Sequence, residues 1–306
     1  MKTPLIRLIL LATFLSNCAQ KTELKRYPLS PSEVLSQSTD SEWRKVNQED
    51  LIYMQLPHGL VVFELVPWFA PEHVDNIKNI VLSRFWDGLP IMRSQDNYVV
   101  QWGDQDKVRK NYFKRKKWNV KKTMTKKEFE MRFPQRGDFH TPLEKDVYAH
   151  KVGFYHEMPV GHDRKKENMW LLHCYGMVGV SRDVDPLSGN GESLYVVTGH
   201  SPRHLDRNIT LVGRVLKGME HLSSLPRGKG TLGFYKDKKK YTKIKSIRIG
   251  NELKKSKQIQ FELMKSNSQS FKKLISARKD RKEDWFYRPA GQVEICNVPI
   301  PIREKN

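Results

Sequence analysis

The chain has 306 residues, with 55 Lys and Arg against 34 Asp and Glu, and a formal net charge of +21. Hydrophobic residues make up 38%, too many for a wholly disordered chain, and three cysteines are too few for a disulfide-framework protein. No apolar run reaches the roughly 18–20 residues that a bilayer span needs, which excludes a polytopic membrane protein.

The first 18 residues have the pattern of an export signal. Two basic residues precede the apolar stretch 8–15, which is too short for a stable membrane anchor. The stretch ends in Leu15-Ser16-Asn17-Cys18, which resembles the lipobox of bacterial lipoproteins. That resemblance implies a periplasmic protein lipidated at Cys18, and Ala19 after it favours the outer membrane. An ordinary cleaved signal and a buried N-terminal helix are the alternatives.

Residues 19–45 are polar and rich in serine, which predicts a flexible tether. Two cysteines remain beyond Cys18, at Cys174 and Cys296. They would pair in an oxidising compartment, and two free, buried thiols are the alternative.

A folded domain is predicted over residues 46–250. Residues 51–56 and 60–66 are rich in β-branched and aromatic side chains and flank the turn Pro57-His58-Gly59, which predicts a β-hairpin. Pro71 then opens a predicted helix, because proline at the first turn removes no helical hydrogen bond. Apolar residues recur at helical spacing after it and are interpreted as core: Val74, Ile77, Ile80, Val81 and Phe85.

A series of motifs follows along the chain. They are Phe85-Trp86-Asp87-Gly88, Gln101-Trp102-Gly103-Asp104, Gly176 to Arg182, Gly189-Asn190-Gly191, Tyr195 to Thr198, His204-Leu205-Asp206, and Thr210 to Val215 with Gly218-Met219. Over about residues 50–104 and 174–250, this series resembles the cyclophilin-type peptidyl-prolyl isomerases. The resemblance implies a mainly β fold, a closed eight-stranded antiparallel barrel capped by two helices.

The activity implied by the resemblance is rotation about Xaa-Pro amides. No bond breaks in this reaction, so it requires no nucleophile, metal or cofactor. A fixed hydrogen-bond donor near the proline nitrogen stabilises the twisted amide more than the planar one. By the resemblance, Arg93 is this donor, since arginine is always charged and presents a rigid fork of N–H groups. Gln101 matches the family glutamine that binds substrate and orients the arginine.

The remaining substrate-binding positions also come from the resemblance. It places a proline pocket on Tyr98, Val99, Tyr195 and Leu205, for which ordinary barrel core is the alternative. The other implied contacts are the backbone of Ser181 and Arg182, the side chain of Ser193 and the rim residue His204. The implied partners are unfolded or extended polypeptides that contain proline.

Several positions depart from the family pattern, including Tyr98 for a phenylalanine, Val99 for a methionine and His204 for a tryptophan. Met92 stands for a histidine, Trp102 for a glycine, Ser193 for a substrate-contacting glutamine and Ile209 for a histidine. We therefore expect reduced activity or altered specificity with the binding site kept. The predicted function is a prolyl isomerase that assists the folding of exported proteins. A catalytically weak peptide-binding or envelope-anchored scaffold is the alternative.

A basic insertion is predicted over residues 105–169. Residues 105–127 hold eleven Lys or Arg and one acid, Asp106, with aromatic residues interleaved. Such a segment suits nucleic-acid phosphates, but an exported protein meets anionic membrane lipid or glycolipid instead, and a solvated flap is a further alternative. The histidines from His140 to His173 match no paired zinc spacing, so no metal site is predicted.

Residues 251–306 form a basic C-terminal extension. A basic amphipathic helix is predicted from about Lys255 to Lys282. We expect this extension to dock on the barrel through its scattered apolar residues, and partner binding is the alternative.

Overall fold

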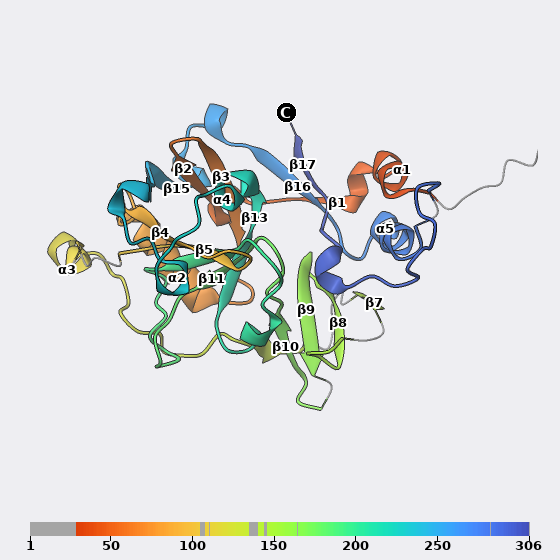
Figure 1. The fold of residues 1–306 in the computed structure, drawn as a ribbon, viewed down its shortest axis with the longest axis horizontal. Helices are drawn as coiled ribbons and strands as arrows, with labels where there is room; N and C mark the ends of the chain where they lie inside the picture. The colour runs from red at the N-terminus through yellow and green to blue at the C-terminus, as the bar shows by residue number, and fades with distance from the viewer. Residues whose placement is uncertain are drawn as a thin grey trace, which may run out of the picture.

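The structure, a computed structural model, describes residues 29–104, 108–109, 111–134, 140–143, 146–163, 165–281 and 283–305. The predicted signal sequence and Cys18 lie outside these residues. A curled nine-stranded antiparallel sheet dominates the fold (Figure 1). Its strands, in the order in which they pair, are β14 (Thr242–Lys243), β4 (Pro90–Ser94), β5 (Val99–Trp102), β12 (Leu194–Val197), β11 (Met177–Val180), β13 (Leu211–Lys217), β3 (Gly59–Leu65), β2 (Leu51–Leu56) and β15 (Ser246–Ile249).

The mainly β fold is confirmed, but the sheet differs from the expected closed barrel of eight strands. It has nine strands, and its two edge strands, β14 and β15, do not pair with each other. Both belong to one continuous segment. Between them, the Ile244 N–H donates to the Leu89 carbonyl at 2.9 Å and the Lys245 N–H to the Gln55 carbonyl at 2.8 Å. The chain therefore passes from one edge of the sheet to the other within two residues. These two hydrogen bonds connect the edges in place of a strand-to-strand ladder between β14 and β15.

The predicted hairpin and helix are confirmed. β2 and β3 pair antiparallel around a turn that joins Leu56 to Gly59. Helix α2 (Pro71–Leu82) begins at the expected proline and buries Val74 and Ile77 in the main hydrophobic core. A second, shorter helix, α4 (Met219–Ser223), follows β13.

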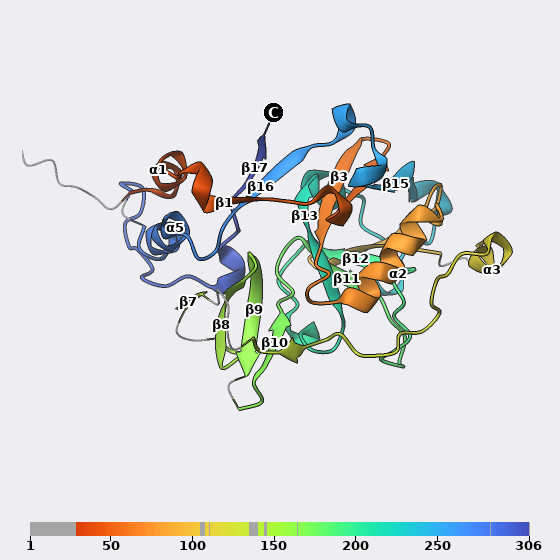
Figure 2. The same cartoon turned by 180° about the vertical axis from the view of Figure 1, so that it is seen from behind.

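The insertion builds a sheet of its own. In pairing order its strands are β6 (Met131–Arg132), β10 (Asn168–Leu171), β9 (Met158–Asp163), β8 (Lys151–Tyr155) and β7 (His140–Leu143). The basic part of the insertion contains α3 (Tyr112–Lys116) and then an irregular segment that runs beside α2. Figure 2 shows this path from the side of α2.

The predicted tether is wrong for residues 29–45. Ser30 and Glu33 form a capping box that starts α1 (Pro31–Ser36), whose Val34 is buried. β1 (Trp43–Lys45) then pairs with β16 (Gln260–Met264). The serine that suggested flexibility is a helix cap here. Residues 19–28 lie outside the described residues.

The C-terminal extension docks on the rest of the molecule, as expected. The predicted helix over 255–282 is found only as α5 (Gln269–Lys279), which lies beside α1 in both views (Figures 1 and 2). Residues 260–264 form a strand instead, because β16 pairs on one side with β1 and on the other with β17 (Ile302–Lys305). No helix in the described part of the chain is long and apolar enough to cross a bilayer.

A disulfide attaches the extension to the segment that precedes β11. Cys174 and Cys296 are bonded, with their Cα atoms 5.0 Å apart. The sequence left this pairing open, and the structure decides it in favour of the disulfide.

Candidate active site

Arg93 and Gln101 face each other across two paired strands. They are register partners in β4 and β5, and the Arg93 Nη1 donates to the Gln101 Oε1 at 3.0 Å. The Arg93 Nε donates to the Leu232 carbonyl at 2.6 Å, and its Nη2 donates to Gln95. The guanidinium is therefore fixed by three acceptors on three different segments.

Two aromatic rings flank this guanidinium. Its Cζ lies 5.6 Å from the ring centroid of Tyr98 and 5.4 Å from that of Phe234, within the range of cation–π contact. Burial lowers the pKa of Arg93 from its ordinary value, while Tyr98 acts in the opposite direction. Arginine titrates so far above neutrality that the group remains a cation. The two rings thus exclude part of the water around the Arg93 guanidinium and help to keep its positive charge in a defined orientation.

Two serines orient the amide of Gln101. Its Nε2 donates to the Ser181 Oγ at 2.9 Å and to the Ser193 Oγ at 3.0 Å. Ser193 is itself held, since its Oγ donates to the Trp102 carbonyl at 3.1 Å. Because both amide protons of Gln101 are engaged, its carbonyl oxygen is the atom that faces Arg93. The serine that stands for the family glutamine is thus part of the network.

A small apolar cluster adjoins the arginine. It is separate from the main core and consists of Val99, Tyr195 and Val197, with Tyr98 and Ile209 packed against them. Three of the four residues predicted for the proline pocket meet in this cluster.

The fourth predicted pocket residue, Leu205, does not belong to this cluster. It is half-buried in the short 3-10 helix Arg203–Leu205. Among the described residues, Ile209 packs on the cluster instead. Sequence reasoning treated Ile209 only as a lost histidine.

His204 and Arg182 occupy the surroundings of the cluster in different ways. The exposed ring of His204 lies parallel to that of Tyr98, with centroids 6.3 Å apart and planes 3° apart, which agrees with a rim position. The side chain of Arg182 turns to the loops, where its Nε donates to the Asn208 carbonyl at 2.9 Å. Only the backbone of Arg182 is left for the predicted peptide contact.

Three residues of the site were missed by sequence reasoning. Gln95 lies two positions after Arg93, so the alternation of a strand would have placed both on one face. Leu232 and Phe234 lie at least 139 residues after Arg93 in the chain, and no local sequence pattern connects them to it. Their approach depends on the fold of the loop after α4.

Comparison with known proteins agrees with this geometry. The family model for cyclophilin-type peptidyl-prolyl cis-trans isomerases, which includes cyclophilin-like domains, matches residues 51–249. Probable peptidyl-prolyl cis-trans isomerases of Brucella suis and Brucella abortus are 23% and 22% identical to the chain over 184 residues, 59% of this chain and 73% of each relative. A cyclophilin from Hirschia baltica is similar in fold, with a TM-score of 0.66 and 23% identity over 90% of this chain and 97% of that chain.

Proposed function

The chain belongs to the cyclophilin-type peptidyl-prolyl cis-trans isomerase family, and from this premise we propose that Arg93 and Gln101 catalyse the rotation of Xaa-Pro amides. The observation that carries the proposal is the fixed guanidinium of Arg93 beside a separate apolar cluster. The cluster accepts the proline ring, and Arg93 reaches the amide nitrogen from the side.

The barrier to this rotation is about 18–20 kcal/mol without a catalyst, because the amide loses its conjugation. In the twisted state the proline nitrogen carries a lone pair that accepts a hydrogen bond. Arginine has five N–H groups, and three of those on Arg93 have acceptors among the described residues. The other two are available to the substrate. A donor held in place before the reaction stabilises the twisted state preferentially.

A protease-coupled isomerisation assay with an Xaa-Pro peptide tests the proposal. Arg93→Ala should lower kcat/KM by about 10²–10³-fold, the usual cost of losing one preorganised transition-state donor. Arg84→Ala is the matched control, since Arg84 is ion-paired with Glu252 at 2.6 Å outside the site. Equal rates for wild type and Arg93→Ala would contradict the role of Arg93, and no wild-type rate above background would favour a peptide-binding module instead.

We further propose that the protein is exported and anchored through a lipid on Cys18, where it assists the folding of exported proteins. The lipobox-like sequence supports this proposal, as does the Cys174–Cys296 disulfide, since such bonds persist mainly in oxidising compartments. Mass spectrometry of the mature protein tests it. The wild type should carry the mass of acyl chains, and Cys18→Ser should lose both this mass and membrane association. A Cys18→Ser variant with unchanged mass and localisation would exclude lipidation.

A further inference from the structure

A buried histidine lies directly behind the apolar cluster. His173 precedes β11 and is fully buried. One ring nitrogen, Nε2, lies 2.9 Å from the Tyr195 hydroxyl, and the other, Nδ1, lies 2.8 Å from the Asp206 Oδ1. The backbone N–H of His173 donates to the same Asp206 oxygen at 3.0 Å. His173 thus connects a carboxylate to a residue of the proposed proline pocket.

The directions of these hydrogen bonds follow from the groups involved. A carboxylate only accepts, so the Nδ1 of His173 carries the proton that faces Asp206. In a neutral imidazole, Nε2 is then an acceptor, and the Tyr195 hydroxyl donates to it. Burial lowers the pKa of His173 against the opposing effect of Asp206, and burial raises the pKa of Tyr195 well above its usual value. Both groups therefore keep the protonation states that this arrangement needs.

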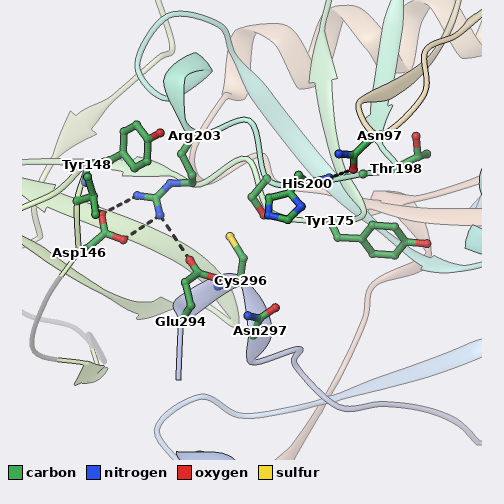
Figure 3. A pocket seen from close by; sticks show the side chains of 13 residues that line it. Asn97, Asp146, Tyr148, Tyr175, Thr198, His200, Arg203, Glu294, Cys296 and Asn297 are labelled. Carbon is green, nitrogen blue, oxygen red and sulfur yellow. Dashed lines mark hydrogen bonds and ion pairs between the residues drawn. The ribbon is translucent and has the colours of Figure 1, made fainter. Parts of the chain in front are cut away.

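Asp206 is in turn held by a buried arginine. The Arg203 Nε donates to the Asp206 Oδ2 at 2.5 Å. The two Nη atoms of Arg203 bind both oxygens of Asp146 at 2.9 and 3.0 Å, and Nη1 lies 3.8 Å from Glu294. Figure 3 shows this outer part, which lines a cavity of 620 Å³. Asp146 comes from the insertion and Glu294 from the C-terminal extension. Both therefore contact Arg203, which holds the Asp206 carboxylate that binds His173.

The strand next to Tyr195 offers its ring no side chain to pack against. Gly179 is the register partner of Tyr195 in β11, and a Cβ atom added to Gly179 would overlap the phenol ring. The ring therefore lies across a glycine, with no side chain beneath it at that position. The hydrogen bond to His173 determines where the end of this ring rests.

We propose that His173 is a positioning residue for prolyl isomerisation, which holds Tyr195 in the pocket and is itself oriented by Asp206 and Arg203. This inference rests on the proposed function. His173 lies behind the pocket and acts through Tyr195. Losing the hydrogen bond frees a ring that must be ordered again when substrate binds, so the expected change is in KM rather than in kcat.

Steady-state kinetics of four variants test the proposal. His173→Leu and Tyr195→Phe should each raise KM about fivefold, the equivalent of one ordinary hydrogen bond. The double variant should be no worse than either single variant, since both remove the same contact. His173→Gln, which keeps an acceptor for the phenol, should restore most of the loss.

His73→Leu is the matched control. His73 is buried and binds a carboxylate, with its Nδ1 2.6 Å from the Glu128 Oε2, but it lies in α2 rather than behind the pocket. This variant should lose thermal stability with KM unchanged. A KM for His173→Leu equal to that of wild type, or additive effects in the double variant, would overturn the proposal.

The outcomes separate this inference from the proposed function. If the wild type is active and His173→Leu has the same KM, only the positioning role of His173 is contradicted. If the wild type is inactive, the proposed function is contradicted. In the second case, the same comparison of variants is made on the peptide dissociation constant measured by NMR titration. If His173→Leu does not fold, Tyr195→Phe removes only one oxygen and decides the question by itself.

Discussion

The register between β4 and β5 brings Arg93 and Gln101 into direct contact. The family resemblance was enough to select both residues, and their direct hydrogen bond at 3.0 Å agrees with that selection. The third acceptor of the guanidinium could not be selected in this way. The Leu232 carbonyl belongs to a distant loop, and a backbone carbonyl carries no mark in the sequence.

Ser193 provides a test at this scale, because it stands where the family has a glutamine. Ser193→Ala removes one of the two acceptors of the Gln101 amide and leaves the other, on Ser181. We expect kcat/KM to fall about fivefold, corresponding to about 1 kcal/mol for one hydrogen bond. The protease-coupled assay measures this change. Unaltered kinetics in Ser193→Ala would mean that Ser181 alone orients Gln101.

At the scale of elements, helix α2 depends on residues supplied by the insertion. Its N-cap position, Ala70, offers no side-chain acceptor. Glu128 accepts instead from the backbone N–H groups of Glu72 and His73 at 3.1 and 3.0 Å. A carboxylate at this end of a helix also interacts favourably with the helix dipole. The insertion therefore completes the helix as well as covering it.

Glu72 anchors the basic segment of the insertion and should make stability depend on pH. Burial opposes the ionisation of Glu72, but hydrogen bonds from Lys121 and Thr125 outweigh it and lower its pKa to about 2. The group is ordinarily half-protonated near pH 4.5. Its stabilising contribution is therefore complete above about pH 4.5 and is lost as the pH falls towards about 2.

Glu72→Gln should lower the free energy of unfolding at pH 7 by about 1.5–3 kcal/mol, the usual range for a hydrogen bond to a charged group. It should also flatten the acid-side decline seen in wild type. Urea unfolding at several pH values measures both effects, with the exposed Glu49→Gln as control. An equally steep decline in Glu72→Gln and wild type would contradict the role given to Glu72.

Sequence reasoning succeeded for elements whose pattern is local and failed where pairing partners are distant. The hairpin of β2 and β3 and the start of α2 were predictable from a turn, a proline and an apolar stripe. The strand β16 was not, because its partners β1 and β17 come from both ends of the described chain. Residues 29–45 were misread for the same reason, since a three-residue strand has no recognisable pattern without its partner.

At the scale of the whole molecule, the disulfide links parts of the chain that are 122 residues apart. Closing a loop of this length restricts the unfolded chain strongly, so Cys296→Ser should lower the free energy of unfolding by about 3–5 kcal/mol. Denaturant unfolding with and without a reductant measures the effect. Reductant should destabilise the wild type to the level of the variant and leave Cys296→Ser unchanged. A wild type insensitive to reductant would show that the bond does not form.

The excess of positive charge lies mainly in the insertion, in the segment that carries β14 and β15, and in the C-terminal extension. Residues 105–127 and 236–282 contain many of the lysines and arginines, and neither stretch supplies Arg93 or Gln101. Part of this charge is paired with carboxylates elsewhere in the fold, as the ion pair between Lys121 and Glu72 of α2 shows at 2.7 Å. The net positive charge is therefore a property of the surface around the active site and takes no part in the proposed catalysis by Arg93 and Gln101.

The central claim is that Arg93 accelerates the rotation of an amide that the apolar cluster holds. Two-dimensional NMR exchange spectroscopy on an Xaa-Pro peptide observes rotation and binding in one sample. With wild-type protein, exchange cross-peaks should connect the cis and trans resonances. With Arg93→Ala, these cross-peaks should disappear while peptide-induced shifts of the protein persist. Cross-peaks of equal intensity with both proteins would contradict the claim.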